Sequence, residues 1–103
     1  MSEFVTVAKA TDVAEGELRA FDVDGTSVAL ANVVGALYAF GNICTHRHCP
    51  LAKGKLDGTA VTCPCHGSMF DVTNGAVLKG PAEEPVGSYT VRMEGEGVAM
   101  ATP

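Results

Sequence analysis

The sequence has 103 residues, of which 47% are hydrophobic and 18% are charged. This length fits one domain, and this composition excludes an acidic disordered tail, because disordered chains are poor in hydrophobic residues. The formal net charge is −5, from 7 Lys and Arg against 12 Asp and Glu residues, so we do not expect nucleic-acid binding.

No stretch of the sequence resembles a membrane span. The densest apolar run, residues 28–40, is interrupted by Asn32 and Gly35, and it is shorter than the ~20 residues that a spanning helix needs. The first residues lack the basic and apolar segments of a signal peptide. We therefore expect no membrane association, a cytoplasmic location and, by default, a monomer.

Short segments rich in Val, Thr, Phe, Tyr and Leu recur along the chain and predict β-strands. The predicted strands cover residues 4–7, 18–23, 27–32, 37–41, 60–63, 69–72, 77–78, 89–93 and 98–101. Residues 10–15 favour one helical turn. The dipeptides Asp24-Gly25, Asp57-Gly58 and Asn74-Gly75 favour tight hairpins, because these residue types tolerate positive φ. The sequence thus predicts a mostly β fold, a small antiparallel sandwich or barrel.

The predicted strands leave three irregular segments, residues 42–55, 64–68 and 79–87. All the cysteines and histidines lie on the first two segments or at their edges. This arrangement, reactive groups on loops of a rigid β scaffold, is common at functional sites. In a chain without an export signal, such clustering indicates a metal before it indicates a disulfide framework.

The spacing of these residues forms two similar pairs. The first pair is Cys44-x-His46, sixteen residues follow, and the second pair is Cys63-x-x-His66. Each pair offers one thiolate and one imidazole, so two loops that meet would supply two sulfur and two nitrogen donors.

Several kinds of site use such donors. A structural zinc site accepts two Cys and two His, but zinc fingers usually order them Cys-Cys then His-His. A plant-type iron–sulfur site needs C-x₄-C-x₂-C, and only Cys44 and Cys49 fit the first interval. A nucleophilic Cys–His enzyme uses one of each and leaves the doubled pattern unexplained.

The two segments resemble the paired C-x-H and C-x-x-H boxes of the Rieske [2Fe–2S] family. Downstream, Lys79-Gly80-Pro81-Ala82 is similar to the proline loop that covers the cluster in that family. The resemblance extends over nearly the whole chain and implies a single Rieske domain, residues 1–103, with a cluster-binding subdomain at about residues 42–80.

The resemblance implies one [2Fe–2S] cluster as cofactor, with Cys44 and Cys63 on one iron and His46 and His66 on the other. Two imidazoles in place of two thiolates make the centre less negative. Its reduction potential therefore rises from about −400 mV in plant-type centres to roughly −150 to +300 mV.

Two further positions are expected to tune the cluster, Ser68 and Pro81. Ser68 matches the serine that donates to a bridging sulfide in high-potential Rieske proteins, whereas Phe70 replaces a tyrosine that donates to a cysteine sulfur there. We therefore expect a potential above the lowest Rieske ferredoxins and below the respiratory proteins.

The resemblance also implies a disulfide between Cys49 and Cys65, which match a second cysteine pair of the high-potential branch. Many dioxygenase ferredoxins lack this pair. The alternative is two reduced, buried thiols, because disulfides are rare in the cytosol. His48 has no place among the four ligands, and we expect a solvated loop residue.

The expected function is one-electron transfer, and the chain itself is not expected to be an enzyme. Rieske-type ferredoxins of this size pass electrons from a flavin-containing, NAD(P)H-dependent reductase to a terminal oxygenase, often an aromatic-ring dioxygenase in aromatic hydrocarbon catabolism. Two alternatives stay open: a Rieske-fold small subunit of a larger reductase, such as nitrite reductase, and a structural zinc-binding domain.

Overall fold

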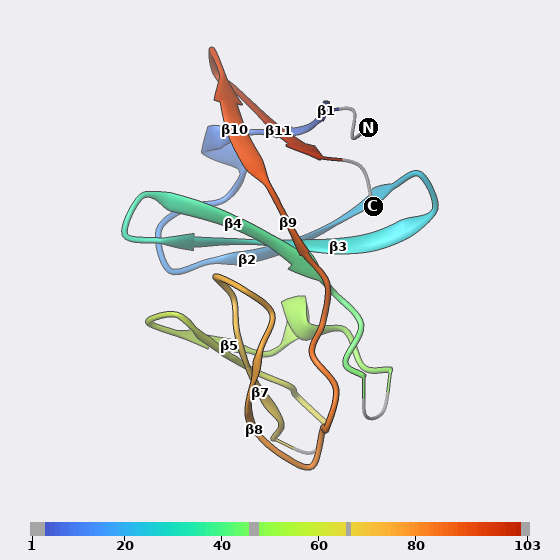
Figure 1. Cartoon of the computed structure of the whole chain (residues 1–103). Helices are drawn as coiled ribbons and strands as arrows, with labels where there is room; N and C mark the ends of the chain where they lie inside the picture. The colour runs from blue at the N-terminus through green and yellow to red at the C-terminus, as the bar shows by residue number, and fades with distance from the viewer. Residues whose placement is uncertain (1–3, 46–47, 66, 102–103) are drawn as a thin grey trace.

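The computed structural model describes residues 4–45, 48–65 and 67–101, and within them the strands form three antiparallel sheets (Figure 1). The first sheet has the order β1 (Phe4–Lys9), β11 (Gly97–Ala101), β10 (Val91–Glu94). The second has the order β2 (Leu18–Val23), β3 (Thr26–Val33), β4 (Ala36–Gly41), β9 (Ser88–Tyr89). The third has the order β5 (Lys55–Asp57), β6 (Ala60–Thr62), β7 (Met69–Asp71), β8 (Val77–Lys79). The predicted mostly β fold is confirmed.

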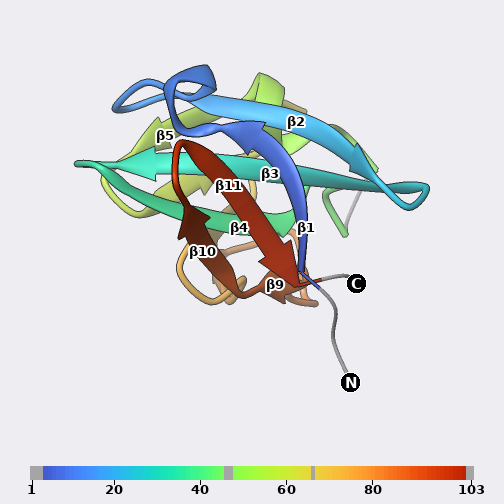
Figure 2. The ribbon, with the colours of Figure 1, turned by 90° about the horizontal axis from the view of Figure 1, so that it is seen from above.

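The second sheet is the middle layer of the molecule. Figure 1 shows it between the other two sheets, and Figure 2 shows the first sheet lying over it. Strand β3 is buried on both faces: Val28 and Leu30 belong to the core shared with the first sheet, and Ala29 and Ala31 belong to the core shared with the third. Because side chains alternate along a strand, one continuous apolar run serves both cores.

Each predicted strand is present in the structure, but one of them is divided into two strands and the structure has one strand that was not predicted. Residues 89–93 were predicted as one strand, but the chain changes sheets at Thr90: Tyr89 pairs with Ala39 in the second sheet, and Val91 pairs with Met100 in the first. Strand β5 was missed. The predicted helical turn is the 3-10 helix η1 (Ala10–Asp12).

The three predicted turns differ in outcome. Asp24-Gly25 is a tight turn in which both residues have positive φ, 52° and 82°. At the next hairpin Asp57 still belongs to β5 and pairs with Ala60, so the turn lies one residue later than expected. Gly75 has a φ of 80°, but five residues, 72–76, separate β7 from β8, so this connection is a loop.

Residues 42–87 form one excursion from the middle sheet. They leave at the end of β4 and return at β9, and the two ends meet where the Gly41 N–H donates to the Gly87 carbonyl at 2.8 Å. The excursion contains the third sheet, the 3-10 helix η2 (Leu51–Lys53) and all the cysteines. Both predicted metal-binding loops belong to this excursion: the first follows β4, and the second joins β6 to β7 in the third sheet.

Candidate metal centre

The first cysteine loop runs from Ile43, which forms an isolated bridge with Pro50. Inside it, the Cys44 N–H donates to the Cys49 carbonyl at 2.9 Å, and the Cys44 carbonyl accepts from the His48 N–H at 2.9 Å. His48 has a φ of 58°, a left-handed conformation that histidine tolerates better than most residues. Its side chain is exposed, as expected.

Asn42 fixes this loop to the scaffold. Its side chain is 3% exposed, its Nδ2 donates to the Ser27 Oγ at 2.9 Å, and its Oδ1 accepts from the Ala52 N–H at 2.8 Å. Its carbonyl accepts from the Leu51 N–H at 2.6 Å. One buried amide thus joins β3, the loop and η2, and buried side chains that are hydrogen-bonded in this way rigidify a site.

The second cysteine loop repeats the hydrogen-bond pattern of the first. The Cys63 N–H donates to the carbonyl five residues on, at Ser68 (2.7 Å), and the Cys63 carbonyl accepts from the N–H four residues on, at Gly67 (3.3 Å). Gly67 has a φ of 78° and occupies the position of His48. The described residues of the two loops are therefore matched in their backbone hydrogen bonds although their sequences differ, which spacing alone did not reveal.

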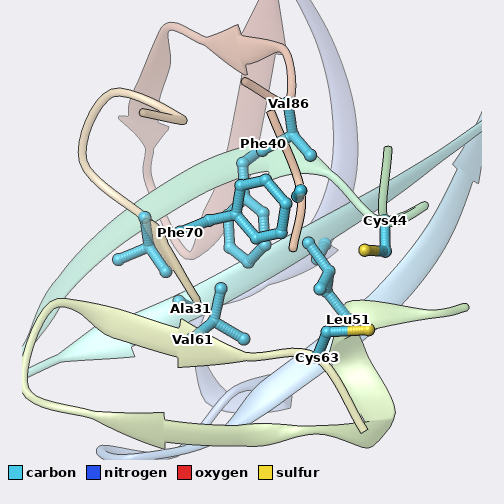
Figure 3. Packing of buried hydrophobic residues seen from close by; sticks show 11 residues of the cluster. Ala31, Phe40, Cys44, Leu51, Val61, Cys63, Phe70 and Val86 are labelled. Carbon is cyan, nitrogen blue, oxygen red and sulfur yellow. The ribbon is translucent and has the colours of Figure 1, made fainter. Parts of the chain in front are cut away.

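The two loops bring Cys44 and Cys63 to the same edge of the lower core, the apolar cluster between the second and third sheets. Both side chains are buried, 0% and 3% exposed, and Figure 3 shows both beside Leu51 at one end of the apolar cluster. Leu51, the first residue of η2, is itself fully buried. The predicted ligands His46 and His66 lie outside the described residues.

Cys49 and Cys65 form a disulfide, with their Cα atoms 6.4 Å apart. Each of the two loops contributes one of these cysteines, so the bond ties the loops together. The Sγ atoms of Cys49, Cys63 and Cys65 all lie within 4.8 Å of one another.

Ser68 places a buried hydroxyl at the base of the second loop. Its side chain is fully buried, and its Oγ accepts from the Ala82 N–H at 3.0 Å. That bond leaves the hydroxyl proton unused, and no acceptor for it is found in the described part of the chain. Buried donors need partners, so this proton fits an acceptor bound between the loops.

The proline loop, residues 79–87, closes over the first cysteine loop. Its Gly80–Pro81 peptide bond is cis, and the Glu84 carbonyl accepts from the Thr45 Oγ1 at 2.7 Å. A hollow of about 390 Å³ is lined by Thr45, Pro81, Glu83 and Glu84. Thr45 was not among the predicted site residues, and no sequence pattern indicates its partner 39 positions away.

The aromatic position near the centre carries no hydroxyl. Phe70, on β7, is fully buried and belongs to the same apolar cluster as Cys44 and Val86. In the described part of the chain no helix is long and apolar enough to cross a membrane.

Residues 3–90 match the Rieske [2Fe-2S] domain family. The chain belongs to this family. The ferredoxin component of the naphthalene 1,2-dioxygenase system of Pseudomonas aeruginosa is a Rieske relative that is 36% identical over 89 residues, which cover 86% of this chain and 86% of that protein.

Solved structures give the same result. The ferredoxin of carbazole 1,9a-dioxygenase from Nocardioides aromaticivorans IC177 superposes with a TM-score of 0.94, at 33% identity, over 99% of this chain and 100% of that chain. A chain in a complex of reduced oxygenase and oxidized ferredoxin in carbazole 1,9a-dioxygenase has a TM-score of 0.89 at 31% identity, over 95% of this chain and 92% of that one.

The cofactor of a Rieske domain is a [2Fe–2S] cluster, and the described residues fit it. Two buried thiols stand on matched loops, and a buried hydroxyl has a proton to donate. Thiolates are the iron ligands of such clusters, and hydrogen bonds to the sulfurs set the potential.

Proposed function

We propose that this chain is a one-electron carrier, the ferredoxin component of a multicomponent dioxygenase system. The observation that carries the proposal is the pair of matched loops that bring the buried thiols of Cys44 and Cys63 to one edge of the core. The naphthalene dioxygenase ferredoxin and the oxygenase-bound ferredoxin described above support the same role. The chain is the electron-transfer component, not the oxygenating enzyme.

Four residues are proposed to hold the cluster: Cys44 and Cys63 on one iron, His46 and His66 on the other. The cluster supplies reversible one-electron chemistry. Two neutral imidazoles make the centre two charges less negative than four thiolates would, so an added electron is more stable there. This places the potential in the range of roughly −150 to +300 mV.

Ser68 and Pro81 are proposed to tune the centre. The unused proton of the Ser68 hydroxyl would stabilise the extra electron density on the sulfur atoms of a reduced cluster. The proline loop that carries Pro81, joined to the first cysteine loop by the Thr45–Glu84 hydrogen bond, would limit water access. Phe70 has no hydroxyl to add a second such bond. We therefore place the potential below that of Rieske proteins with a tyrosine at this position.

The proposed route for electrons is through the exposed rim of the site. Cys44 and Cys63 are buried, whereas the neighbouring Thr45, Pro64 and Pro81 are exposed, so the centre lies at shallow depth. A shallow centre lets two proteins exchange electrons without rearranging either fold.

The proposed partners are a flavin-containing ferredoxin reductase and a terminal oxygenase, with an aromatic compound as the oxygenase substrate. The reductase is inferred from the reducing equivalents that such a system needs. We also propose that the carrier acts as a single-domain monomer in the cytoplasm, where NAD(P)H is available, and that residues of about 42–80 form the cluster-binding subdomain.

Reconstitution tests this function. The purified protein is mixed with a flavin reductase, NAD(P)H and a ring-hydroxylating oxygenase, and oxygenated product is measured with and without the carrier. We expect product only when the carrier is present, and none from a His46→Ala, His66→Ala double variant. A colourless protein with stoichiometric zinc would contradict the proposal in favour of the structural zinc domain. A red-brown protein that copurifies with a larger reductase would favour the other alternative, a Rieske-fold small subunit of that reductase.

A further inference from the structure

The disulfide has a third sulfur beside it. The Sγ atoms of Cys49, Cys63 and Cys65 lie within 4.8 Å of one another, although only the first and last are bonded. Cys63 is 3% exposed and is held by backbone hydrogen bonds to Gly67 and Ser68. A thiol this close to a disulfide needs little motion to attack it.

We propose that Cys63 exchanges into this disulfide when it is released from iron, so that the Cys49–Cys65 bond is replaced by a Cys49–Cys63 bond. The inference rests on the proposed role of Cys63 as an iron ligand. While the thiolate is bound to iron its electron pair is engaged, and the disulfide stays as the structure shows it. Loss of iron removes that protection.

The step needs no oxidant. The Cys63 thiol gives its proton to water, and the thiolate attacks the Cys49 Sγ. A Cys63–Cys49 bond forms as the Cys49–Cys65 bond breaks, and the electron pair of the broken bond stays on the Cys65 Sγ, which takes up a proton from water. One disulfide and one thiol are present before and after the exchange.

The surroundings favour Cys49 as the sulfur attacked and Cys65 as the leaving group. A Cys63–Cys65 disulfide would close a ring over Pro64 alone, whose φ is fixed by its own ring. Cys65 is exposed and Cys49 is half-buried, so a thiolate is better solvated on Cys65. Exchange therefore moves the thiol from a buried position to the surface.

The consequence is a site that closes itself after losing its cluster. A Cys63 sulfur bonded to Cys49 cannot bind iron, so a new cluster cannot be inserted until a thiol reductant reverses the exchange. Cluster insertion then depends on the thiol redox state of the surroundings as well as on the supply of iron and sulfide.

Two single variants isolate this step, because each removes one proposed iron ligand and only one of them keeps the attacking sulfur. Cys44→Ser retains Cys63, and Cys63→Ser does not. Both proteins are kept metal-free under argon, acid-quenched at intervals, alkylated and mapped by tandem mass spectrometry. Fragmentation in the mass spectrometer is required because trypsin cuts after Lys or Arg, and neither separates Cys63 from Cys65.

In Cys44→Ser we expect alkylation to move from Cys63 to Cys65 over minutes to hours, together with a Cys49–Cys63 linked peptide, since disulfide reshuffling takes seconds to hours. In Cys63→Ser we expect the Cys49–Cys65 link alone. The wild-type protein, loaded with its cluster and then treated with an iron chelator, gives a second measurement that does not depend on the folding of either variant.

Appearance of the Cys49–Cys63 link after chelation, and not before it, would support the proposal. Persistence of Cys49–Cys65 as the only link for a day, in both the chelated protein and Cys44→Ser, would overturn it. Failure of the proposed function is a separate result: purified protein without iron and sulfide would refute the carrier, whereas the comparison of the two variants still reports on exchange.

Discussion

The hydroxyl groups of Ser68 and Thr45 each form a hydrogen bond that joins a cysteine loop to the proline loop. The Ser68 Oγ accepts from the Ala82 N–H at 3.0 Å, and the Thr45 Oγ1 donates to the Glu84 carbonyl at 2.7 Å. The first bond is buried and the second is exposed, so we expect the two hydroxyl groups to have different roles. We propose that Ser68 acts on the reduction potential of the centre, and that Thr45 acts on the closure of the proline loop over the first cysteine loop.

Replacing Ser68 with Ala should lower the reduction potential. A hydrogen bond to a charged acceptor contributes ~1.5–3 kcal/mol, which corresponds to about 65–130 mV for one electron. Ser88→Ala, at an exposed serine of β9, is the control and should leave the potential unchanged. The measurement is a redox titration followed by absorbance. An unaltered potential in a folded Ser68→Ala protein would show that the hydroxyl does not donate to the cluster.

Replacing Thr45 with Val should loosen the proline loop at nearly constant side-chain size. A neutral hydrogen bond contributes ~0.5–1.5 kcal/mol, so we expect cluster loss to a chelator to be about 2–10 times faster. Thr45→Ser keeps the hydroxyl and should match the wild-type rate. Equal bleaching rates for the valine and wild-type proteins would refute a role for this bond.

Among the structural elements, the two cysteine loops depend on anchors that lie outside them. Asn42, at the end of β4, joins the first loop to β3 and η2, and the disulfide joins the first loop to the second. The loops themselves are short, and within the described residues each has two backbone hydrogen bonds to the peptide groups of its buried cysteine, Cys44 or Cys63. Removing an anchor should therefore affect stability and cluster retention together.

Asn42→Ala removes two side-chain hydrogen bonds and leaves the Ala52 N–H without its acceptor. We expect the free energy of unfolding to fall by about 1–3 kcal/mol, because the half-buried Ala52 N–H, left without its acceptor, adds a desolvation cost to the lost bonds. Asn74→Ala is the matched control, since Asn74 is exposed and caps only its own loop at the Ala76 N–H. The measurement is urea unfolding, and equal loss in both variants would contradict the anchoring role.

Joint replacement of Cys49 and Cys65 by Ala tests the second anchor. A cross-link that closes a loop of this length contributes ~3 kcal/mol by restricting the unfolded chain. The sequence separation is 16 residues. We expect a lower unfolding midpoint in the double variant, and no further change in midpoint when it is treated with dithiothreitol. A midpoint equal to that of the oxidised wild-type protein would contradict this.

At the scale of the whole molecule, three stacked sheets place one central strand in two cores and leave the cysteine loops at one end of the lower core. Much of this was predictable from the sequence, because the strands carry clear apolar patterns and the doubled Cys–His spacing indicates a metal centre. The disulfide pairing was also expected, but only through the family resemblance.

The remainder depends on long-range contacts that leave no local pattern. Thr90 fits a strand as well as its neighbours do, so the change of sheets between β9 and β10 is visible only in the pairing of Tyr89 and Val91. Strand β5 has one apolar residue, Leu56, between charged ones. The matched backbone geometry of the two cysteine loops arises from different residues, His48 and Gly67, at the same left-handed position.

The central claim is that two cysteines and two histidines bind a single [2Fe–2S] cluster. The most direct test is pulsed EPR of the dithionite-reduced protein, produced in cells that are supplied with ¹⁵N-labelled histidine. The proposed ligand set predicts two iron and two sulfide per chain and couplings from two histidine nitrogens, which fall to one in His46→Cys or His66→Cys. A reduced cluster without histidine couplings, or a protein with one metal ion and no sulfide, would contradict it.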